Sequence, residues 1–230
     1  MANRAYLYSL SNQPTSYTDR PESISGLSEW PYDIPLSYRV LMSGNPTLCA
    51  SLVSDGFDGE PADQKTRLYA ISSEFDAGYQ RLTRLIEIVR QHSDAKHTML
   101  DSALDETLQF LDAHRDRFVL LETIELDTMM TADEAELRRY VEEEIERCRQ
   151  VGEAIDLLPQ DLDEAAALLA EAASNGAESA LDAFFGMRMD DDFDNVRDDM
   201  TEYPLGMVGW YETLYFELWN KAEFDARNNA

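Results

Sequence analysis

The residues with the clearest capacity for chemistry are the aspartates near position 190. Asp190, Asp192 and Asp194 place carboxylate oxygens at alternate positions, as the opening of a calcium-binding loop does. The sixth position of such a loop needs glycine and here is Asn195, and the twelfth needs a bidentate glutamate and here is Thr201. We therefore interpret the segment as a solvated acidic loop, either idle or used against a basic partner, and expect no metal ion and no cofactor.

The remaining reactive side chains form no recognisable catalytic motif. The histidines, His92, His97 and His114, lack the His-x-x-x-His spacing of a zinc site, and the chain has no Cys-x-x-Cys pair. Cys49 and Cys148 fall in a predicted strand and on the apolar side of a predicted helix, which favours buried thiols. A Gly-rich phosphate loop and a Gly-x-Ser-x-Gly motif are also absent from the sequence. We therefore expect that the protein is not an enzyme.

Charge is the strongest global signal. The 230 residues include 46 acidic and 19 basic side chains, for a formal net charge of -27. Such a surface repels nucleic acids and anionic membranes and attracts a basic protein. Residues 95–230 hold 34 acids and 11 bases, so this part carries -23 of the total. The asymmetry predicts an acidic working face in the second part of the chain and a one-to-one complex with a basic protein.

Two groups of acids are the candidate partner-binding residues. The first choice is the loop, with Asp190, Asp191, Asp192, Asp194, Asp198 and Asp199, and the second choice is a helix face, with Glu142, Glu143 and Glu146. The helix also carries arginines three and four residues away, so a solvated, internally paired face is the alternative interpretation there. If the loop is a contact surface, replacing its four aspartates at 190–194 by asparagine weakens the complex and leaves folding intact.

The elements that must position these acids divide the chain near Ser73. Residues 5–10, 47–53 and 66–71 are rich in apolar and β-branched side chains and predict strands, with a short helix from Asp33 between the first two. From Ser73 onward apolar residues recur at three and four positions, which predicts helices. We expect a single domain, 1–230, of the α+β class and predominantly helical. It combines a small α+β region, 1–72, whose strands end by about residue 75, with an acidic bundle-like part, 73–230.

Several helices of the second part have clear boundaries in the sequence. Residues 96–115 form one, Thr131 and Glu134 form a capping box that opens another, and Pro159 ends it. Asp161 and Glu164 open the next. The apolar run 118–121 fits either a buried loop or a short strand. Residues 205–224 are apolar nearly all round, which predicts a buried helix.

Localisation follows from what the sequence lacks. The first twenty residues contain no apolar core of a secretory signal, and no stretch of the chain is apolar for long enough to span a membrane. The two cysteines are too few and too far apart for a disulfide framework. These features predict a cytoplasmic protein.

The two ends of the chain carry a resemblance. The opening Met1 to Arg4 followed by Tyr6 to Ser9, and the closing Gly206-x-x-x-Trp210 pattern, resemble a group of bacterial cytoplasmic proteins identified with immunity partners of polymorphic toxins. The resemblance implies a protein that binds and neutralises a cognate toxin domain, and it assigns no catalytic residue. A toxin that acts on nucleic acids needs a basic surface, so an acidic inhibitor would complement it.

Two other functions remain open at this point. One is an enzyme with a carboxylate site, which a deep pocket with perturbed carboxylates would favour. The other is an acidic adaptor or chaperone for a basic protein without toxic activity. A toxin gene directly upstream is expected for an immunity protein only.

Overall fold

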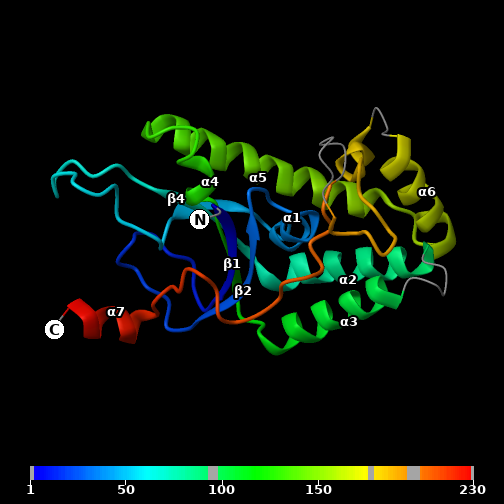
Figure 1. Ribbon diagram of the computed structural model, residues 1–230, viewed down its shortest axis with the longest axis horizontal. Coiled ribbons are helices and arrows are strands. Elements are labelled where there is room, and N and C mark those ends of the chain that lie inside the picture. The colour runs from blue at the N-terminus through cyan, green and yellow to red at the C-terminus, as the bar shows by residue number, and fades with distance from the viewer. Residues whose placement is uncertain (1–2, 93–97, 176–178, 196–202, 229–230) are drawn as a thin grey trace.

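The computed structural model of the protein describes residues 3–92, 98–175, 179–195 and 203–228 and has an α+β fold (Figure 1). Five antiparallel strands form one sheet in the order β2-β1-β5-β4-β3. The strands are β1 (Arg4–Leu10), β2 (Ile24–Pro31), β3 (Thr47–Ala50), β4 (Tyr69–Glu74) and β5 (Phe118–Glu122). The predicted α+β class is confirmed.

The helices contain more residues than the strands, and several of them pack on the sheet and on one another. They are α1 (Leu36–Met42), α2 (Phe75–His92), α3 (Thr98–Ala113), α4 (Ile124–Asp127), α5 (Glu134–Leu157), α6 (Leu162–Asn175) and α7 (Lys221–Asn228), with a 3-10 turn η1 (Ala180–Phe184). Helices α1, α2 and α5 all contact strands. None of the helices in the described ranges is long and apolar enough to cross a membrane.

The predicted limit of the strands at about residue 75 is wrong, because β5 is the central strand. It pairs with β1 on one side and with β4 on the other. Val119, Leu120 and Leu121 are all buried, since the sheet is covered on both faces. A strand buried on both faces lacks the alternation of apolar and polar residues by which strands are predicted. Of the two alternatives for the apolar run 118–121, the short strand is therefore confirmed. The edge strand β2 was not predicted, because Gly26 and the prolines around it indicate a loop.

The long helices lie where their apolar spacing predicted them. Helix α5 starts with Asp133 as its N-cap, which accepts a hydrogen bond from the backbone N–H of Glu136. This start lies two residues beyond the predicted cap at Thr131. In α6, the Asp161 carboxylate accepts from the backbone N–H of Glu164, as the predicted cap requires.

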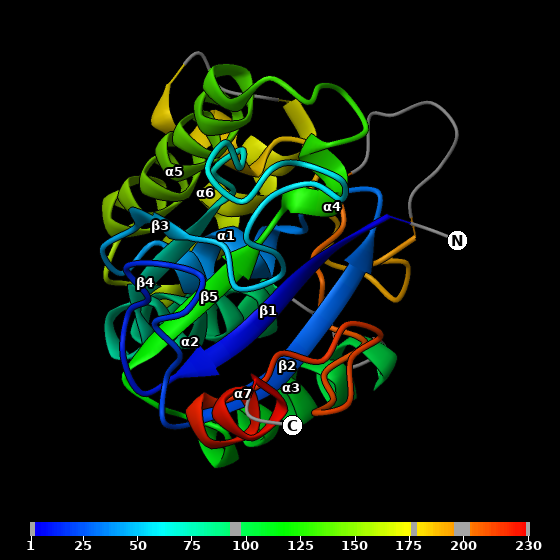
Figure 2. The ribbon, with the colours of Figure 1, turned by 90° about the vertical axis from the view of Figure 1, so that its left-hand side faces the viewer.

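The two faces of the sheet are covered by different parts of the chain. Leu7 and Leu121 point to the face where the helices pack, and Tyr8 and Leu120 point to the other face. Figure 2 shows the C-terminal segment and α7 on the viewer's side of β1 and β2, with α2, α5 and α6 behind the sheet. The sheet therefore has two apolar interfaces, of which only one is made by helices.

The predicted helix at 205–224 is wrong. This segment has no regular helix until α7 begins at Lys221. Leu205 and Met207 at its start pack in the core on the helical side of the sheet, and the part from Leu214 runs across the second face. Leu214, Phe216 and Leu218 pack against that face, whereas Tyr215 and Glu217 between them are exposed. Apolar contacts at every second residue belong to an extended chain, and the neighbouring aromatic residues hid this period in the sequence.

Candidate functional site

The aspartate of the acidic loop that lies deepest has a structural role. The Asp194 carboxylate accepts hydrogen bonds from the backbone N–H groups of Gly206, Met207 and Val208, the last two at 2.9 Å. Burial raises the pKa of Asp194, and these backbone hydrogen bonds oppose the shift. Asp194 therefore anchors the start of the C-terminal segment and does not project toward a partner.

The other described aspartates of the loop also have intramolecular partners. Arg188 binds Asp190 at 2.9 Å and Asp192 at 3.0 Å. Asp191 accepts a hydrogen bond of 3.1 Å from the backbone N–H of Leu100, in the first turn of α3. Two further predicted contact residues, Asp198 and Asp199, lie outside the described residues. The described part of the loop is thus tied into the fold by the carboxylates that were expected to bind a partner.

The predicted acids of α5 form ion pairs along the exposed side of the helix. Glu142 pairs with Arg138 at 2.8 Å and Glu143 with Arg139 at 2.5 Å. Glu146 lies 3.6 Å from Arg149. All of these side chains are about half exposed, so each pair contributes only a few tenths of a kcal/mol, roughly 0.3–0.5. Of these acids, Glu143 also borders a cavity.

This cavity, called the α4–α5 cleft, is the candidate functional site. It has a volume of about 400 Å³ and lies between residues 32–34, α4 with the turn after it, and the first half of α5. Tyr32, Met129 and Met130 line it and are unusually exposed, at 65%, 56% and 73%. Tyr32 has a positive φ of 64°, an uncommon conformation for a non-glycine residue. Exposed apolar side chains are thus gathered at the mouth of this hollow.

A buried ion pair forms one wall of the α4–α5 cleft. The Glu144 side chain is only 4% exposed and accepts from Arg39 Nε at 2.5 Å and Nη2 at 3.1 Å. Arg147 donates a further hydrogen bond to Glu144 at 3.0 Å. A buried carboxylate is tolerated when such donors satisfy it. Glu144 is therefore neutralised by its own neighbours.

Asp127 is a partly buried carboxylate of the cleft that has no counter-ion among the described residues. Burial raises the pKa of Asp127 to about 6, the hydrogen bond from Thr123 opposes this shift, and the charge of Glu144 adds to it. In the described parts of the chain, no lysine, arginine or histidine pairs with Asp127. An ionised carboxylate in this position attracts a cation from outside.

Sequence reasoning missed most of this cleft. Glu143 was among the predicted contacts, and the Met129–Met130 pair was a visible signal for an adaptable surface. Asp127 is the last residue of the short helix α4 and belongs to no recognisable motif. Arg39 lies 105 positions before Glu144 in the sequence, so only the fold brings them together.

The thiols and the carboxylates do not suggest a reactive centre or a metal site elsewhere. Cys49 and Cys148 are buried, and burial raises the pKa of both thiols well above the ordinary value. Neither is therefore a ready nucleophile. Within the described ranges, no group of three or more His, Cys, Asp or Glu side chains is placed to hold a metal ion.

Comparison with known proteins places the chain in a family. The model of a family described as a domain of unknown function, DUF7822, matches residues 11–174. No curated protein and no solved structure matches the chain. The matched range includes the whole α4–α5 cleft and excludes both β1 and the C-terminal segment. Because the match covers well over half of the sequence, the chain belongs to the DUF7822 family.

Proposed function

We propose that this protein binds and neutralises a basic partner domain in the bacterial cytoplasm, as an immunity protein does with its toxin. The observation that carries the proposal is the α4–α5 cleft, where exposed Tyr32, Met129 and Met130 surround an Asp127 carboxylate without a counter-ion. Tyrosine and methionine are enriched in protein interfaces, and methionine side chains adapt to irregular partners.

The charge of the whole chain supports a basic partner. A net charge of -27 speeds the encounter with a positively charged domain and disfavours acidic competitors. The carboxylates of the loop and of α5 contribute to this long-range field even though they are paired within the molecule. In the complex, an arginine or lysine of the partner would lie against Asp127, and the rim would bury apolar surface.

An enzyme with a carboxylate site is the second candidate, and the raised pKa of Asp127 favours it. Its neighbour Glu144 is held by two arginines and is not available as the second member of an acid–base pair. The apolar rim is also better explained by a macromolecular partner than by a small substrate. We therefore place partner binding first.

The direct test is co-expression with the protein encoded immediately upstream. We expect the two proteins to co-elute at a ratio of one to one, and we expect cells that express the neighbour to grow only when this protein is present. A complex with a neighbour that is not toxic would support the adaptor function. Absence of a complex and of growth rescue would reject the immunity function.

Substitution in the α4–α5 cleft locates the contact. Asp127→Asn should weaken the complex by about tenfold or more, since close interfacial charge pairs contribute about 1.5–7 kcal/mol. Affinity of the wild type should also fall as the pH is lowered through about 6, where Asp127 becomes protonated. The control is Glu153→Gln, an exposed acid of α5 that does not line the cleft. Equal affinities for both variants would remove the cleft from the interface.

A further inference from the structure

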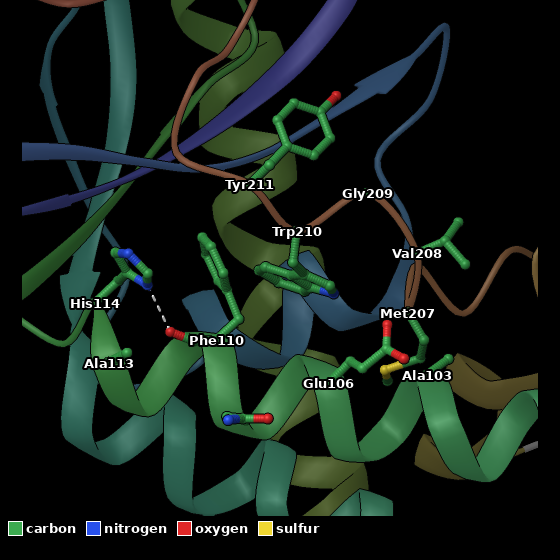
Figure 3. A pocket seen from close by; sticks show the side chains of 11 residues that line it. Ala103, Glu106, Phe110, Ala113, His114, Met207, Val208, Gly209, Trp210 and Tyr211 are labelled. Carbon is green, nitrogen blue, oxygen red and sulfur yellow. Dashed lines mark hydrogen bonds between the residues drawn. The ribbon is translucent and has the colours of Figure 1, made fainter.

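A second hollow, called the α3 groove, lies between α3 and residues 207–211 of the C-terminal segment. Its volume is about 520 Å³. Glu106 and Phe110 line it from α3, His114 from the turn directly after α3, and Trp210 from the C-terminal segment (Figure 3). The volume lies within the range of small-molecule sites, about 300–1,000 Å³. Neither the family match nor the proposed function assigns a role to this groove.

Aromatic rings form the floor of the α3 groove. The rings of Phe110 and His114 are stacked, with centroids 4.1 Å apart, and the ring of Phe110 lies 6.4 Å from that of Trp210. Figure 3 shows Phe110 between His114 and Trp210, with all three side chains in the space between α3 and the C-terminal segment. The faces of aromatic rings carry negative electrostatic potential and attract cations.

One carboxylate of the α3 groove has no basic partner among the described residues. The Glu106 carboxylate accepts a hydrogen bond from the Ser102 hydroxyl at 3.0 Å, and no described basic side chain binds it. Both ring nitrogens of His114 face oxygen atoms at 2.7 Å, the carbonyl of Phe110 and the carboxylate of Glu212. Among the described residues that line the groove, His114 is the one basic side chain, and it is already paired with Glu212. The Glu106 carboxylate would therefore repel an anionic ligand.

We infer that the α3 groove binds a small organic cation, an ammonium group that carries an apolar body. The ammonium group would lie over Phe110 and Trp210 with Glu106 as its counter-ion, and the apolar body would occupy the rest of the groove. Aromatic faces combined with a carboxylate distinguish such a ligand from neutral molecules of the same shape. The α4–α5 cleft has no part in this inference, which stands independently of the proposed function.

The test compares choline with 3,3-dimethylbutan-1-ol, which has the same shape and no charge. The chain has three tryptophans, so 15N labelling gives three indole N–H resonances, and Trp210→Phe identifies the one in the groove. We expect a saturable shift of the Trp210 resonance with choline and little change of the other two. The neutral alcohol should bind at least about fivefold more weakly, as expected for the loss of a cation–π contact.

Two substitutions and one matched control define the site. Glu106→Gln removes the counter-ion and Phe110→Leu removes an aromatic face, and each should weaken choline binding by about three- to tenfold. Glu87→Gln makes the same chemical change on the exposed side of α2 and should change binding by less than about twofold. Circular dichroism checks that each variant is folded, and Glu106 is exposed, so its replacement does not disturb the core.

The inference is overturned by any of three results. These are the absence of a saturable shift with choline, equal binding of choline and the neutral alcohol, and unchanged choline binding in Glu106→Gln. Binding of choline together with failure to bind any basic partner would reject the proposed function and leave this inference standing. Binding of a basic partner without binding of choline would reject this inference and leave the proposed function standing.

Discussion

The two faces of the sheet show how differently one protein can build its two interfaces. On the first face, Leu7 and Leu121 pack into a large apolar core with α1, α2 and α5. On the second face, Tyr8 and Leu120 pack against an extended segment that comes from the far end of the chain. Regular amphipathic helices cover the first face, and a segment with little regular structure covers the second.

The second face contains a buried carboxylate and a buried hydroxyl group with specific partners. Glu122 is fully buried there and accepts hydrogen bonds from the backbone N–H of Leu52 at 2.6 Å and from the Ser51 hydroxyl at 2.8 Å. The Tyr8 hydroxyl donates to the carbonyl of Phe216 at 2.6 Å. Both faces therefore combine apolar packing with buried polar contacts, since the helical face also buries the hydrogen bond from the Tyr38 hydroxyl to Ser28 and the ion pair of Arg39 with Glu144.

Leu120 and Leu121 are adjacent in β5 and point to opposite faces, so replacing each in turn compares the two faces. We expect the larger loss of stability on the helical face. Leu121→Ala should lower the free energy of unfolding by about 3–5 kcal/mol, and Leu120→Ala by about 2–3 kcal/mol. Both side chains are fully buried, but the extended segment can move into a cavity more easily than a layer of packed helices. Urea unfolding of the two variants measures the difference. Equal losses would show that the two coverings are equally rigid.

The pH dependence of stability tests the polar character of the second face. Burial raises the pKa of Glu122 to about 7, against the hydrogen bonds from Leu52 and Ser51. Because the unfolded chain releases this proton near its ordinary pKa, raising the pH from about 5 to about 8 should lower stability through Glu122 by about 3 kcal/mol.

Glu122→Gln isolates this contribution. Its carboxamide does not titrate, so the difference in stability between the wild type and the variant should shift in favour of the variant as the pH rises through this window. Urea unfolding at several pH values between these limits measures it. Parallel curves of stability against pH for the wild type and Glu122→Gln would mean that burial does not raise the pKa of Glu122.

Asp194→Ala tests whether the acidic loop anchors the start of the segment whose later part covers the second face. The substitution leaves the backbone N–H groups of Gly206, Met207 and Val208 without their acceptor and should cost about 2–4 kcal/mol of stability. The control, Asp58→Ala, removes an exposed loop acid and should change stability by less than about 0.5 kcal/mol. A gain in stability for Asp194→Ala would restore the sequence-based expectation that the loop aspartates are dispensable for folding.

The smallest effect is expected on the outer side of α5, which belongs to neither interface of the sheet. Glu142→Gln breaks the exposed pair with Arg138 and should lower stability by roughly 0.3–0.5 kcal/mol. The loss should disappear at high salt, where such pairs are screened. Thermal unfolding with and without added salt measures this, and a loss that persists in salt would indicate a contact other than the ion pair.

The helical half of the fold was accessible from the sequence, and the sheet only in part. Helices α2, α5 and α6 were predicted because their apolar residues recur at three and four positions and because Asp161 and Pro159 mark boundaries. Strands β1, β3 and β4 were also predicted. In contrast, the run that forms β5 was left open between a buried loop and a short strand, since it has no alternation, and β2 was not predicted, since it contains Gly26.

The candidate site divides in the same way. Its composition was visible, because the excess of acids, Glu143 and the Met129–Met130 pair are all local features of the sequence. The roles of the individual acids were not visible. The loop aspartates looked like a free acidic surface, yet Asp194 is bound by backbone groups about twelve residues away, and Asp127 became notable only as a partly buried carboxylate.

The sequence by itself determined the class of the fold, the main helices and the strongly negative charge. These depend on composition and on periods of a few residues, which each segment carries independently of the rest. The tertiary structure alone decided which strand is central, which segment covers the second face of the sheet and which carboxylates lack a partner. These depend on contacts between residues far apart in the chain, such as Arg39 with Glu144 and Tyr8 with Phe216. Such contacts form only when the whole chain has folded, so no local pattern encodes them.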